Sequence, residues 1–414
     1  MVEPLIKNDA VVLGILFIIL AFVFISSNSQ NRWFLKFYKY VPSLLLCYFI
    51  PSILNSMGII SGDHSNLYFV ASRYLLPASL VLLTIGIDLP EIIKLGPKAI
   101  IMFLSGTLGI IIGGPFSIIF ISYLFPNLID GLEIDLVWRG LTTIAGSWIG
   151  GGANQAAMKE IFLVDDAIFS TMIAVDVIVA NIWMAFLLYG SGVHEKIDRI
   201  LNADSSSIDD LRKKIETYRS QILKVPDFVD TVKVMSVAFT LTGIAHFSSD
   251  LIVPYIEINA PQLAKFSLTS NFFWIIVIST SLALILSFTN IRNLEGVGAS
   301  RYGSLFLYIL VATIGMKMNI MGIFENPGLF LVGLVWMAIH VGLLFIVGKI
   351  IRAPFFFLAV GSKANIGGAA SAPVVAAAFH PSLAPVGVLL AVLGYAVGTY
   401  GAYLCGLLMQ TVAP

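Results

Sequence analysis

The sequence predicts an all-α polytopic membrane protein, and three observations support this fold class. Hydrophobic residues make up 58% of the 414 residues, and charged residues only 12%. The mean hydropathy is +0.93, which is too high for a soluble domain that must cover its apolar surface. The apolar residues form about a dozen runs of roughly the 20 residues that a helix needs to cross a bilayer, whereas barrel strands would read as alternating segments of about ten.

The apolar runs follow one another along nearly the whole chain. They lie near residues 11–25, 41–60, 67–89, 98–125, 136–161, 165–190, 231–252, 271–289, 299–321, 327–351, 354–379 and 383–409. The first run lacks the charged start and the cleavage site of a signal peptide, so we expect it to be retained. Cys47 and Cys405 fall inside runs and form neither a metal-ligand spacing nor a disulfide framework.

One hydrophilic stretch, Ser191 to Lys233, divides the chain near its middle. It contains 8 basic and 8 acidic residues of the 24 of each kind in the chain. Apolar residues at helical spacing predict a short amphipathic helix outside the bilayer. These residues are Ile208, Leu211, Ile215, Tyr218 and Ile222. We therefore predict a first transmembrane repeat over 1–190, a linker over 191–233 and a second repeat over 234–414.

The two halves carry matching signatures in their third and fifth runs. Thr84-Ile-Gly-Ile-Asp88 ends the third run, and Thr313-Ile-Gly-Met-Lys317 ends the ninth. Gly146-Ser147, followed by Gly151-Gly152-Ala153, lies in the fifth run. The eleventh run has Gly361-Ser362, followed by Gly367-Gly368-Ala369. These matches predict two related repeats of six segments each.

The basic residues indicate that the repeats are inverted. If each glycine-broken segment enters and leaves on one side, each half has five crossings, and 17 of the 24 Lys and Arg residues are cytoplasmic. The loop with Asp130, Glu133 and Asp135 is then outside. If both segments crossed fully, basic residues of the second half, such as Arg292 and Lys349, would lie opposite those near Arg32. We therefore predict two inverted repeats, each with about five transmembrane helices plus a glycine-broken re-entrant hairpin or discontinuous helix.

The two glycine-broken segments predict a substrate site. Irregular backbone at membrane depth is tolerated where it is buried in protein or lines a cavity, and half-helix ends offer N–H groups to anions and carbonyls to Na+. Alternatively, the glycines only permit close helix packing. Because the breaks occur as a pair, we favour a binding role for the residues around them. These are Ser147, Gly151, Gly152, Asn154, Gln155, Ser362, Asn365, Gly367, Gly368 and Ser371.

Asp176 is the strongest candidate for ion coupling. It lies well inside the sixth run, where a lone carboxylate is costly and therefore a functional candidate. Asn181 follows less than one and a half turns later and could share the same surface. A hydrogen-bonded structural Asp is an equally open alternative. Lys363, in the second broken segment, could pair with Asp176, meet an anionic substrate or extend to the membrane surface.

Other residues in the runs have simpler interpretations. Asp88 and Lys317 occupy matching run ends, where interfacial anchors lie. His246 and His340 have no partner at metal-ligand spacing, so we expect packing roles, with proton relay an alternative for His340. The sequence has no P-loop or dinucleotide fingerprint, so we expect no enzyme and no cofactor beyond Na+ as a coupling ion. The net charge of zero gives no reason to expect a nucleic-acid partner.

Two stretches carry a family resemblance. Ala145-Gly-Ser-Trp-Ile-Gly-Gly-Gly-Ala-Asn-Gln-Ala-Ala-Met-Lys-Glu160 and Ile366-Gly-Gly-Ala-Ala-Ser-Ala-Pro-Val-Val-Ala-Ala-Ala-Phe379 resemble a YjcL-like family of bacterial and plastid membrane proteins of unknown function. So does the segment from Leu383 to Tyr400. That family is similar to the cation:proton antiporter and anion transporter superfamily, which includes bile-acid, citrate and glutamate carriers.

The resemblance implies inverted repeats with broken helices or hairpins, elevator-like motion and a homodimer. It also implies location in a bacterial inner membrane, or in the plastid inner envelope if the source is a plant. Proton antiporters of the superfamily commonly use paired acidic residues, whereas Asp176 stands alone in its run.

These features together predict a secondary active transporter. We expect ion-coupled symport, with Na+ or H+, of a small organic and anionic solute by an elevator-like alternating-access mechanism. One alternative is a cation/proton antiporter that uses Asp176. The other is a membrane receptor that signals through the linker and transports nothing. The expected partners are the solute, the lipid bilayer and a second copy of the chain.

Overall fold

The computed structural model is an all-helical fold, with 85% helix and no strand among the residues that it describes. The described residues are 3–38, 41, 43–87, 92–93, 95–124, 134–203, 226–266, 268–317, 328–380 and 383–413. Asp88, Asp130 and Glu133 lie outside them, and so does the amphipathic helix predicted over 208–222. The predicted fold class of a helical membrane protein is confirmed.

Each apolar run predicted from the sequence contains one to three helical elements. The helices before the linker are α1 (Asp9–Ser27), α2 (Arg32–Tyr38), α3 (Ser43–Ser56), α4 (Leu67–Val70), the π-helix η1 (Ala71–Leu75), α5 (Leu76–Ile85), α7 (Pro97–Leu124), α8 (Ile134–Gly150), α9 (Gly152–Ile161) and α10 (Asp166–Gly192). A short helix, α11 (His194–Leu201), extends into the predicted linker.

The second half repeats this pattern of long helices and one broken segment. Its helices are α13 (Phe228–Asn259), η3 (Pro261–Phe266), α14 (Asn271–Ser287), η4 (Asn290–Val297), α15 (Ala299–Gly315), α16 (Gly328–Ile350), α17 (Phe355–Asn365), α18 (Gly368–Phe379) and α19 (Ala384–Val412). Helix α13 begins with a capping box, in which Asp227 and Asp230 each accept a hydrogen bond from the other's backbone N–H. The predicted linker is therefore helical at both described ends.

Among the described residues, seven helices are long and apolar enough to cross a membrane, and the number rises to nine if each of two bent helix pairs counts as one span. The apolar helix α15 is shorter, with 17 residues. Neither α8 with α9 nor α17 with α18 is among these candidates. The two glycine-broken segments thus differ from the spanning helices, as their sequences predict.

Helices α8 and α9 fold back on each other and form a hairpin, which we call hairpin 1. Its tip is Gly151, with φ of +75° and ψ of −173°, a conformation that is essentially restricted to glycine. A Cβ atom added to Gly146 would lie 2.5 Å from the carbonyl oxygen of Asn154, so the two helices touch through backbone. At the open end, the rings of Trp138 and Phe162 lie 5.8 Å apart.

Helices α17 and α18 form hairpin 2 in the same way. Its tip is Ile366-Gly367, and Gly367 and Gly368 have φ of +104° and +54°. At its open end, the rings of Phe356 and Phe379 meet edge to face, 5.4 Å apart. Between a hairpin and a discontinuous helix, which the sequence leaves open, the structure has a hairpin in both halves.

The two hairpins approach from opposite ends of α10. At the first end, Lys159 of hairpin 1 forms an ion pair with Asp166 at 2.8 Å. Beyond the other end, Asp198 of α11 accepts a hydrogen bond of 2.7 Å from the backbone N–H of Phe355, the first residue of hairpin 2. Because α10 has 27 residues, it is about 40 Å long. The hairpins therefore point toward each other along one long helix.

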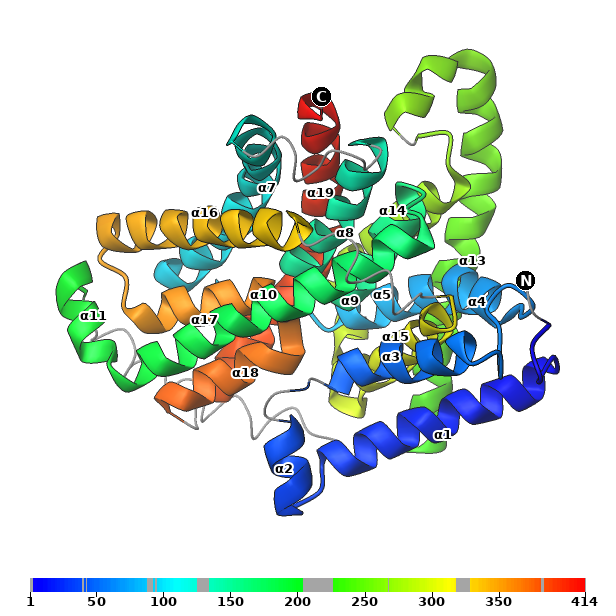
Figure 1. The fold of residues 1–414 in the computed structure, drawn as a ribbon, viewed down its shortest axis with the longest axis horizontal. Helices are drawn as coiled ribbons and strands as arrows, with labels where there is room; N and C mark the ends of the chain where they lie inside the picture. The colour runs from blue at the N-terminus through cyan, green and yellow to red at the C-terminus, as the bar shows by residue number, and fades with distance from the viewer. Residues whose placement is uncertain are drawn as a thin grey trace.

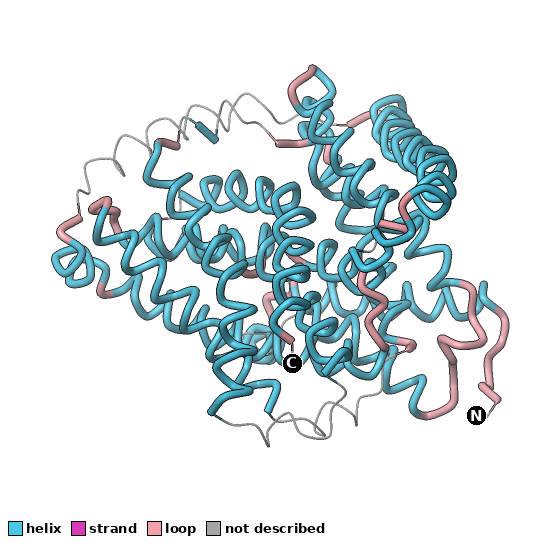
Figure 2. The backbone as a smooth tube through the Cα atoms, turned by 90° about the horizontal axis from the view of Figure 1, so that it is seen from above, coloured by secondary structure: helices cyan, strands magenta, loops and turns pink. Residues whose placement is uncertain are grey.

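The helices divide into two groups by their contacts (Figures 1 and 2). The hairpin group contains α7, α10, α16, α19 and both hairpins, and α7 packs extensively on α16 and α17. The flanking group contains α1, α3, α5, α13, α14 and α15. The groups meet mainly where α5 and α14 contact α9 and α19. This arrangement places both hairpin tips within the hairpin group.

Candidate functional site

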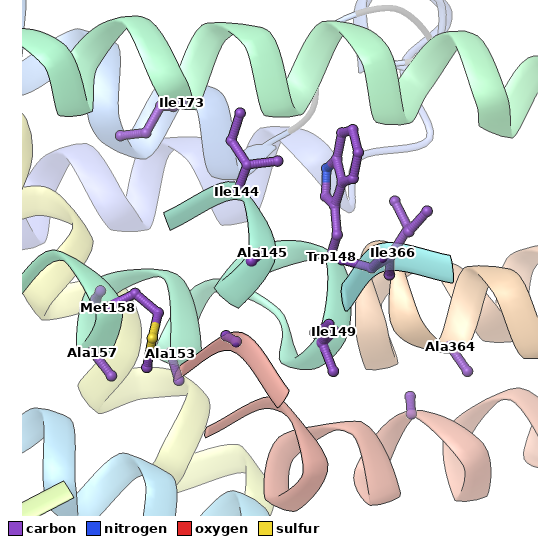
Figure 3. Packing of buried hydrophobic residues seen from close by; sticks show 14 of the residues in the cluster. Ile144, Ala145, Trp148, Ile149, Ala153, Ala157, Met158, Ile173, Ala364 and Ile366 are labelled. Carbon is purple, nitrogen blue, oxygen red and sulfur yellow. The ribbon is translucent and has the colours of Figure 1, made fainter. Parts of the chain in front are cut away.

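The two hairpin tips converge on α19. A Cβ atom added to Gly394 would lie 2.9 Å from the Ile149 carbonyl oxygen and 3.3 Å from that of Ala364. One residue comes from hairpin 1 and the other from hairpin 2, so only glycine allows α19 to pass between them. Figure 3 shows Ile149 and Trp148 of hairpin 1 close to Ile366 and Ala364 of hairpin 2. The candidate site is therefore built around the meeting point of the tips.

Tyr395, the next residue of α19, lies between the two tips. Its ring is 3.7 Å from the position of a Cβ atom on Gly151, and its hydroxyl oxygen is 3.9 Å from that of a Cβ on Gly368. Leu307 of α15 is 3.8 Å from the equivalent position on Gly152. Hairpin 1 thus faces the flanking group at Gly152, and Tyr395 separates the two tips.

An asparagine fixes each hairpin to a long helix. Asn154 donates through Nδ2 to the carbonyls of Gly150 and Tyr395, at 3.1 and 3.0 Å, and accepts at 2.7 Å from the Thr399 hydroxyl. Both of its polar atoms are therefore satisfied inside the protein. Its side chain is fully buried. Asn154 holds hairpin 1 against α19.

Asn365 makes the same set of bonds in hairpin 2. Its Nδ2 donates to the carbonyls of Gly361 and Phe103, at 3.0 and 2.9 Å, and its Oδ1 accepts at 2.7 Å from the Thr107 hydroxyl. Phe103 and Thr107 lie four residues apart on α7, as Tyr395 and Thr399 do on α19. The two predicted asparagines thus hold the hairpins in place, and their polar atoms are not directed at a ligand.

The carboxylate of Asp176 lies beside the tip of hairpin 1. It accepts hydrogen bonds from the Ser147 hydroxyl at 2.6 Å, the Trp148 indole N–H at 2.7 Å and the Gln155 amide at 3.1 Å. The Asp176 side chain is 7% exposed. Three of the four residues of this network, Ser147, Gln155 and Asp176, are among those predicted from the sequence. A carboxylate has about four lone-pair sites, so one position is left for a proton or cation.

Asn181 does not join this network among the described residues. Its amide donates to the Val177 carbonyl of its own helix at 2.8 Å. Five residues along a helix rotate a side chain by about 140°, so Asn181 cannot share the face of Asp176. Its predicted coupling role lacks a contact in the structure.

Lys363 is the cation of the site. It lies in the last turn of α17, is 2% exposed and donates through Nζ to the Ala180 carbonyl at 3.2 Å. Ala180 is one turn beyond Asp176 on α10, and the charges of Lys363 and Asp176 interact electrostatically. Of the alternatives considered for Lys363, the structure excludes extension to the membrane surface.

The hydroxyl of Ser371 has no hydrogen-bond partner among the described residues, although its oxygen is buried. It lies in the first turn of α18, in contact with the position of a Cβ on Gly367. The Lys363 ammonium nitrogen is 3.4 Å from that same position. The N-terminal end of α18 therefore combines a buried cation, an unpartnered hydroxyl and the partial positive charge of a helix N-terminus.

Ser362 belongs to a separate buried chain. Trp183 donates to its Oγ at 2.8 Å, and its Oγ lies 2.8 Å from Nε2 of His340. Nδ1 of His340 lies 3.0 Å from the Gly106 carbonyl, which can only accept, so Nδ1 carries the proton. Ser362 then donates to Nε2. All polar atoms of this chain are satisfied with a neutral histidine, as expected for a packing role.

The long helices that receive the asparagines were missed as site elements. Their contact segments share one pattern, Phe103-Leu-Ser-Gly-Thr-Leu-Gly109 and Tyr395-Ala-Val-Gly-Thr-Tyr-Gly401. The hairpins share another, Gly150-Gly-Gly-Ala-Asn154 and Gly361-Ser-Lys-Ala-Asn365. Searching for Gly-x-x-Ala-Asn would therefore have aligned the asparagines. No group of three or more His, Cys, Asp or Glu side chains in the described ranges could hold a metal ion.

Comparisons with known proteins agree with a membrane protein. The model of a family described as "Protein of unknown function (DUF819)" matches residues 14–412. The chain is also 23% identical over 369 residues to a protein of Bacillus subtilis (strain 168) named "Uncharacterized membrane protein YjcL". The match covers 84% of this chain and 85% of that protein.

Proposed function

Because this chain belongs to the DUF819 family, which carries no assigned activity, we propose a function from its own site. We propose a secondary active transporter that moves a small organic anion together with Na+ or H+. The observation that carries this proposal is the meeting of two hairpin tips, from opposite ends of α10, beside a buried Asp176 and a buried Lys363. Broken segments that meet in the middle of a bundle are typical of binding sites in secondary transporters.

Asp176 takes the coupling cation in this proposal. Neutral donors surround its carboxylate, and they orient it without cancelling its charge. A buried carboxylate among membrane helices is costly and is typical of ion or proton pathways. Asp176 is not part of a carboxylate pair among the described residues. Its partners there are Ser147, Trp148 and Gln155, together with the charge of Lys363.

The N-terminal end of α18 takes the anionic group of the solute. Lys363 supplies a full positive charge, Ser371 a hydroxyl without a partner, and Gly367 an exposed tip. Charge-assisted hydrogen bonds to an anion are stronger than bonds between neutral groups. The body of the solute would lie between the tips and α15, next to Tyr395 and Leu307.

Alternating access would then arise from movement of the hairpin group against the flanking group. Both tips, Asp176 and Lys363 belong to the hairpin group, so they would travel as one unit with the bound solute. The surface facing them on α15 belongs to the flanking group. The division of contacts between the two groups supports an elevator-like mechanism.

The proposal is tested by the melting temperature of the purified protein in detergent. A panel of carboxylates, amino acids, short peptides and nucleosides is added with and without Na+ and at two pH values. A ligand at a hundred times its dissociation constant stabilises the native state by about 2.7 kcal/mol. We expect one solute class to raise the melting temperature, and to raise it more when the coupling cation is present.

Two variants separate the halves of the site. Asp176→Asn should remove the cation-dependent shift, and Lys363→Gln should remove the solute-dependent shift. Asp250→Asn and Lys349→Gln change exposed residues of the same types and serve as matched controls. A shift with Na+ or pH alone, and with no solute, would instead favour a cation/proton antiporter. No shift with any addition would reject a coupled carrier.

A further inference from the structure

A second charged site lies at the open end of hairpin 1, away from Asp176. Asp166 marks this end of α10, and ten residues of helix place it about 15 Å from Asp176. A pocket of about 330 Å³ opens here, and Asp63, Ser65, Tyr68, Ser72, Arg73 and Lys317 are among the residues that line it. A pocket of this size can contain a small organic acid or a phosphate. We call it the Arg73 pocket.

Arg73 lies on the π-helix η1, where the helix takes an additional residue into its turn. Such turns are rare and occur frequently at functional sites. The wider turn leaves the Arg73 carbonyl available to α13, and Nε2 of His246 donates to it at 2.9 Å. His246, expected to have a packing role, thus supports the backbone that carries Arg73.

The guanidinium of Arg73 is held in place by its contacts, but not all of its N–H groups have a hydrogen-bond acceptor among the described residues. Its Nη1 donates to Glu160 at 2.7 Å and to Ser72 at 3.4 Å, and its carbon lies 4.6 Å from the ring centre of Phe272. Both bonds use one nitrogen, and the described residues offer no acceptor to Nε and Nη2. The side chain is 31% exposed, so these donors can reach a ligand in the pocket.

Lys317 is the second cation of the pocket. It was expected to be an interfacial anchor, but its ammonium lies 4.8 Å from the ring centre of Tyr68 and 3.7 Å from a carboxylate oxygen of Asp166. The latter distance is too long for a hydrogen bond. Among the described residues, the ammonium therefore lies near the pocket without an acceptor at hydrogen-bond distance, and its side chain is 24% exposed.

The charged side chains at the pocket form two layers. Arg73, Lys317 and Asp63 line the pocket, and Asp63 is exposed to solvent. Behind them lie Lys159, Glu160 and Asp166, which form ion pairs with one another and with Arg73 and Lys317. Tyr68 joins them, because its hydroxyl donates to Glu160 and accepts from Lys159. The six charges balance, and the excess of positive charge is confined to the lining residues, two cations against one carboxylate.

We propose that the Arg73 pocket binds an oxyanion, either the carboxylate of a small organic acid or inorganic phosphate. The planar fork of Arg73 matches the two oxygens of such a group, and Lys317 neutralises the remaining charge. The anion would lie between η1, which continues directly into α5 of the flanking group, and the open end of hairpin 1, where Arg73 and Glu160 already form an ion pair. This site is independent of the proposed role of Asp176.

The test measures the melting temperature of the full chain against sodium succinate and sodium phosphate, each replacing chloride at constant Na+. We expect a saturable rise with one of the two anions, which identifies the source of the oxyanion. Arg73→Gln and Lys317→Gln should each weaken the apparent affinity by about tenfold or more. Arg73→Lys should weaken it less, because it keeps the charge and loses the fork.

Two controls make the outcome decisive. Arg301→Gln changes an exposed arginine at the other end of α15, and Lys363→Gln removes the cation proposed to bind an anion at the tips. Both should keep the anion-dependent shift. An unchanged affinity in Arg73→Gln and Lys317→Gln, or the absence of a shift with both anions, would overturn the proposal. Loss of the shift in Lys363→Gln would place the anion at the tips instead. If Arg73→Gln does not fold, Lys317→Gln gives the same test.

Discussion

The two hairpins have the same architecture but carry opposite chemistry. Each ends in a glycine with positive φ, each is closed by an aromatic pair, and each is fixed by one asparagine to a long helix. The tip of hairpin 1, however, surrounds the carboxylate of Asp176 with neutral donors, whereas the tip of hairpin 2 carries the ammonium of Lys363 and the hydroxyl of Ser371.

This difference separates structural residues from chemical ones. The asparagines occur in both hairpins with matching partners, so they belong to the shared architecture. In the proposed function, Asp176 and Lys363 carry the chemistry. The carboxylate of Asp176 accepts three hydrogen bonds, whereas the Ser371 hydroxyl near Lys363 has no partner among the described residues, so the proposed anion would complete the ammonium side.

The largest effect should come from Asp176→Asn, which removes the charge and keeps the shape. We expect cation-coupled transport in proteoliposomes to fall by about 100-fold or more, because the coupling carboxylate is lost. The melting temperature should fall only slightly, since the amide oxygen of asparagine can still accept some of the three hydrogen bonds. Asp250→Asn is the matched control on the exposed face of α13. Unchanged transport by Asp176→Asn would assign the cation to another group.

Much of this fold could be predicted from the sequence, because long apolar runs indicate membrane helices and paired glycines indicate hairpin tips. Asp176 and Lys363 were found because an ionisable residue stands out within an apolar run. The partners of Asn154 and Asn365 could not be found in this way, because Thr107, Thr399 and two backbone carbonyls carry no charge.

The pocket formed by Arg73 and Lys317 could not be predicted from the apolar runs taken separately. Arg73 lies within an apolar run at a π-helix that no sequence pattern marks, and Lys317 resembles an ordinary interfacial lysine. The pocket they share joins η1 to the end of α15, which are more than 200 residues apart in the chain. Such a pairing arises only from tertiary packing.

The second prediction compares the tip glycines. Gly151→Ala should destabilise the protein by roughly 1–3 kcal/mol, because its φ and ψ are essentially restricted to glycine. Gly368→Ala should cost only about 1 kcal/mol, since a φ of +54° is a left-handed conformation and its Cβ would make only an ordinary van der Waals contact, 3.9 Å from the Tyr395 hydroxyl. Thermal unfolding in detergent measures both. An equal cost would show that hairpin 1 can relax its tip.

The third prediction tests whether the asparagines are equivalent. Asn154→Ala and Asn365→Ala each remove two hydrogen bonds to a long helix and one to a glycine carbonyl four residues earlier in the hairpin. At about 0.6 kcal/mol per bond between membrane helices, each variant should cost about 1–2 kcal/mol. Asn181→Ala removes one bond within a helix and should have a much smaller effect. Unfolding by denaturant gives the comparison. A large difference between Asn154→Ala and Asn365→Ala would mean that one asparagine also binds the solute.

The smallest expected effect concerns the aromatic pairs at the open ends. Trp138→Leu removes one ring contact, at 5.8 Å, and Phe356→Leu removes two, at 5.4 Å to Phe379 and 5.2 Å to Phe357. An aromatic pair contributes about 0.5–1.5 kcal/mol beyond its buried area. Phe379 also contacts Phe355 at 5.9 Å and His194 at 5.7 Å, so hairpin 2 keeps other ring contacts when Phe356 is lost. Phe162 keeps the stacked ring of Tyr403 when Trp138 is lost.

Both losses should therefore lower the melting temperature slightly and leave transport unchanged, because the tips are fixed separately by Asn154 and Asn365. Transport that falls in step with stability would mean that the open ends, and not the asparagines, set the position of the tips. In that case the contacts of Asn154 with α19 and of Asn365 with α7 would depend on the aromatic pairs, since a tip can reach its long helix only when the open end holds the two helices of the hairpin together.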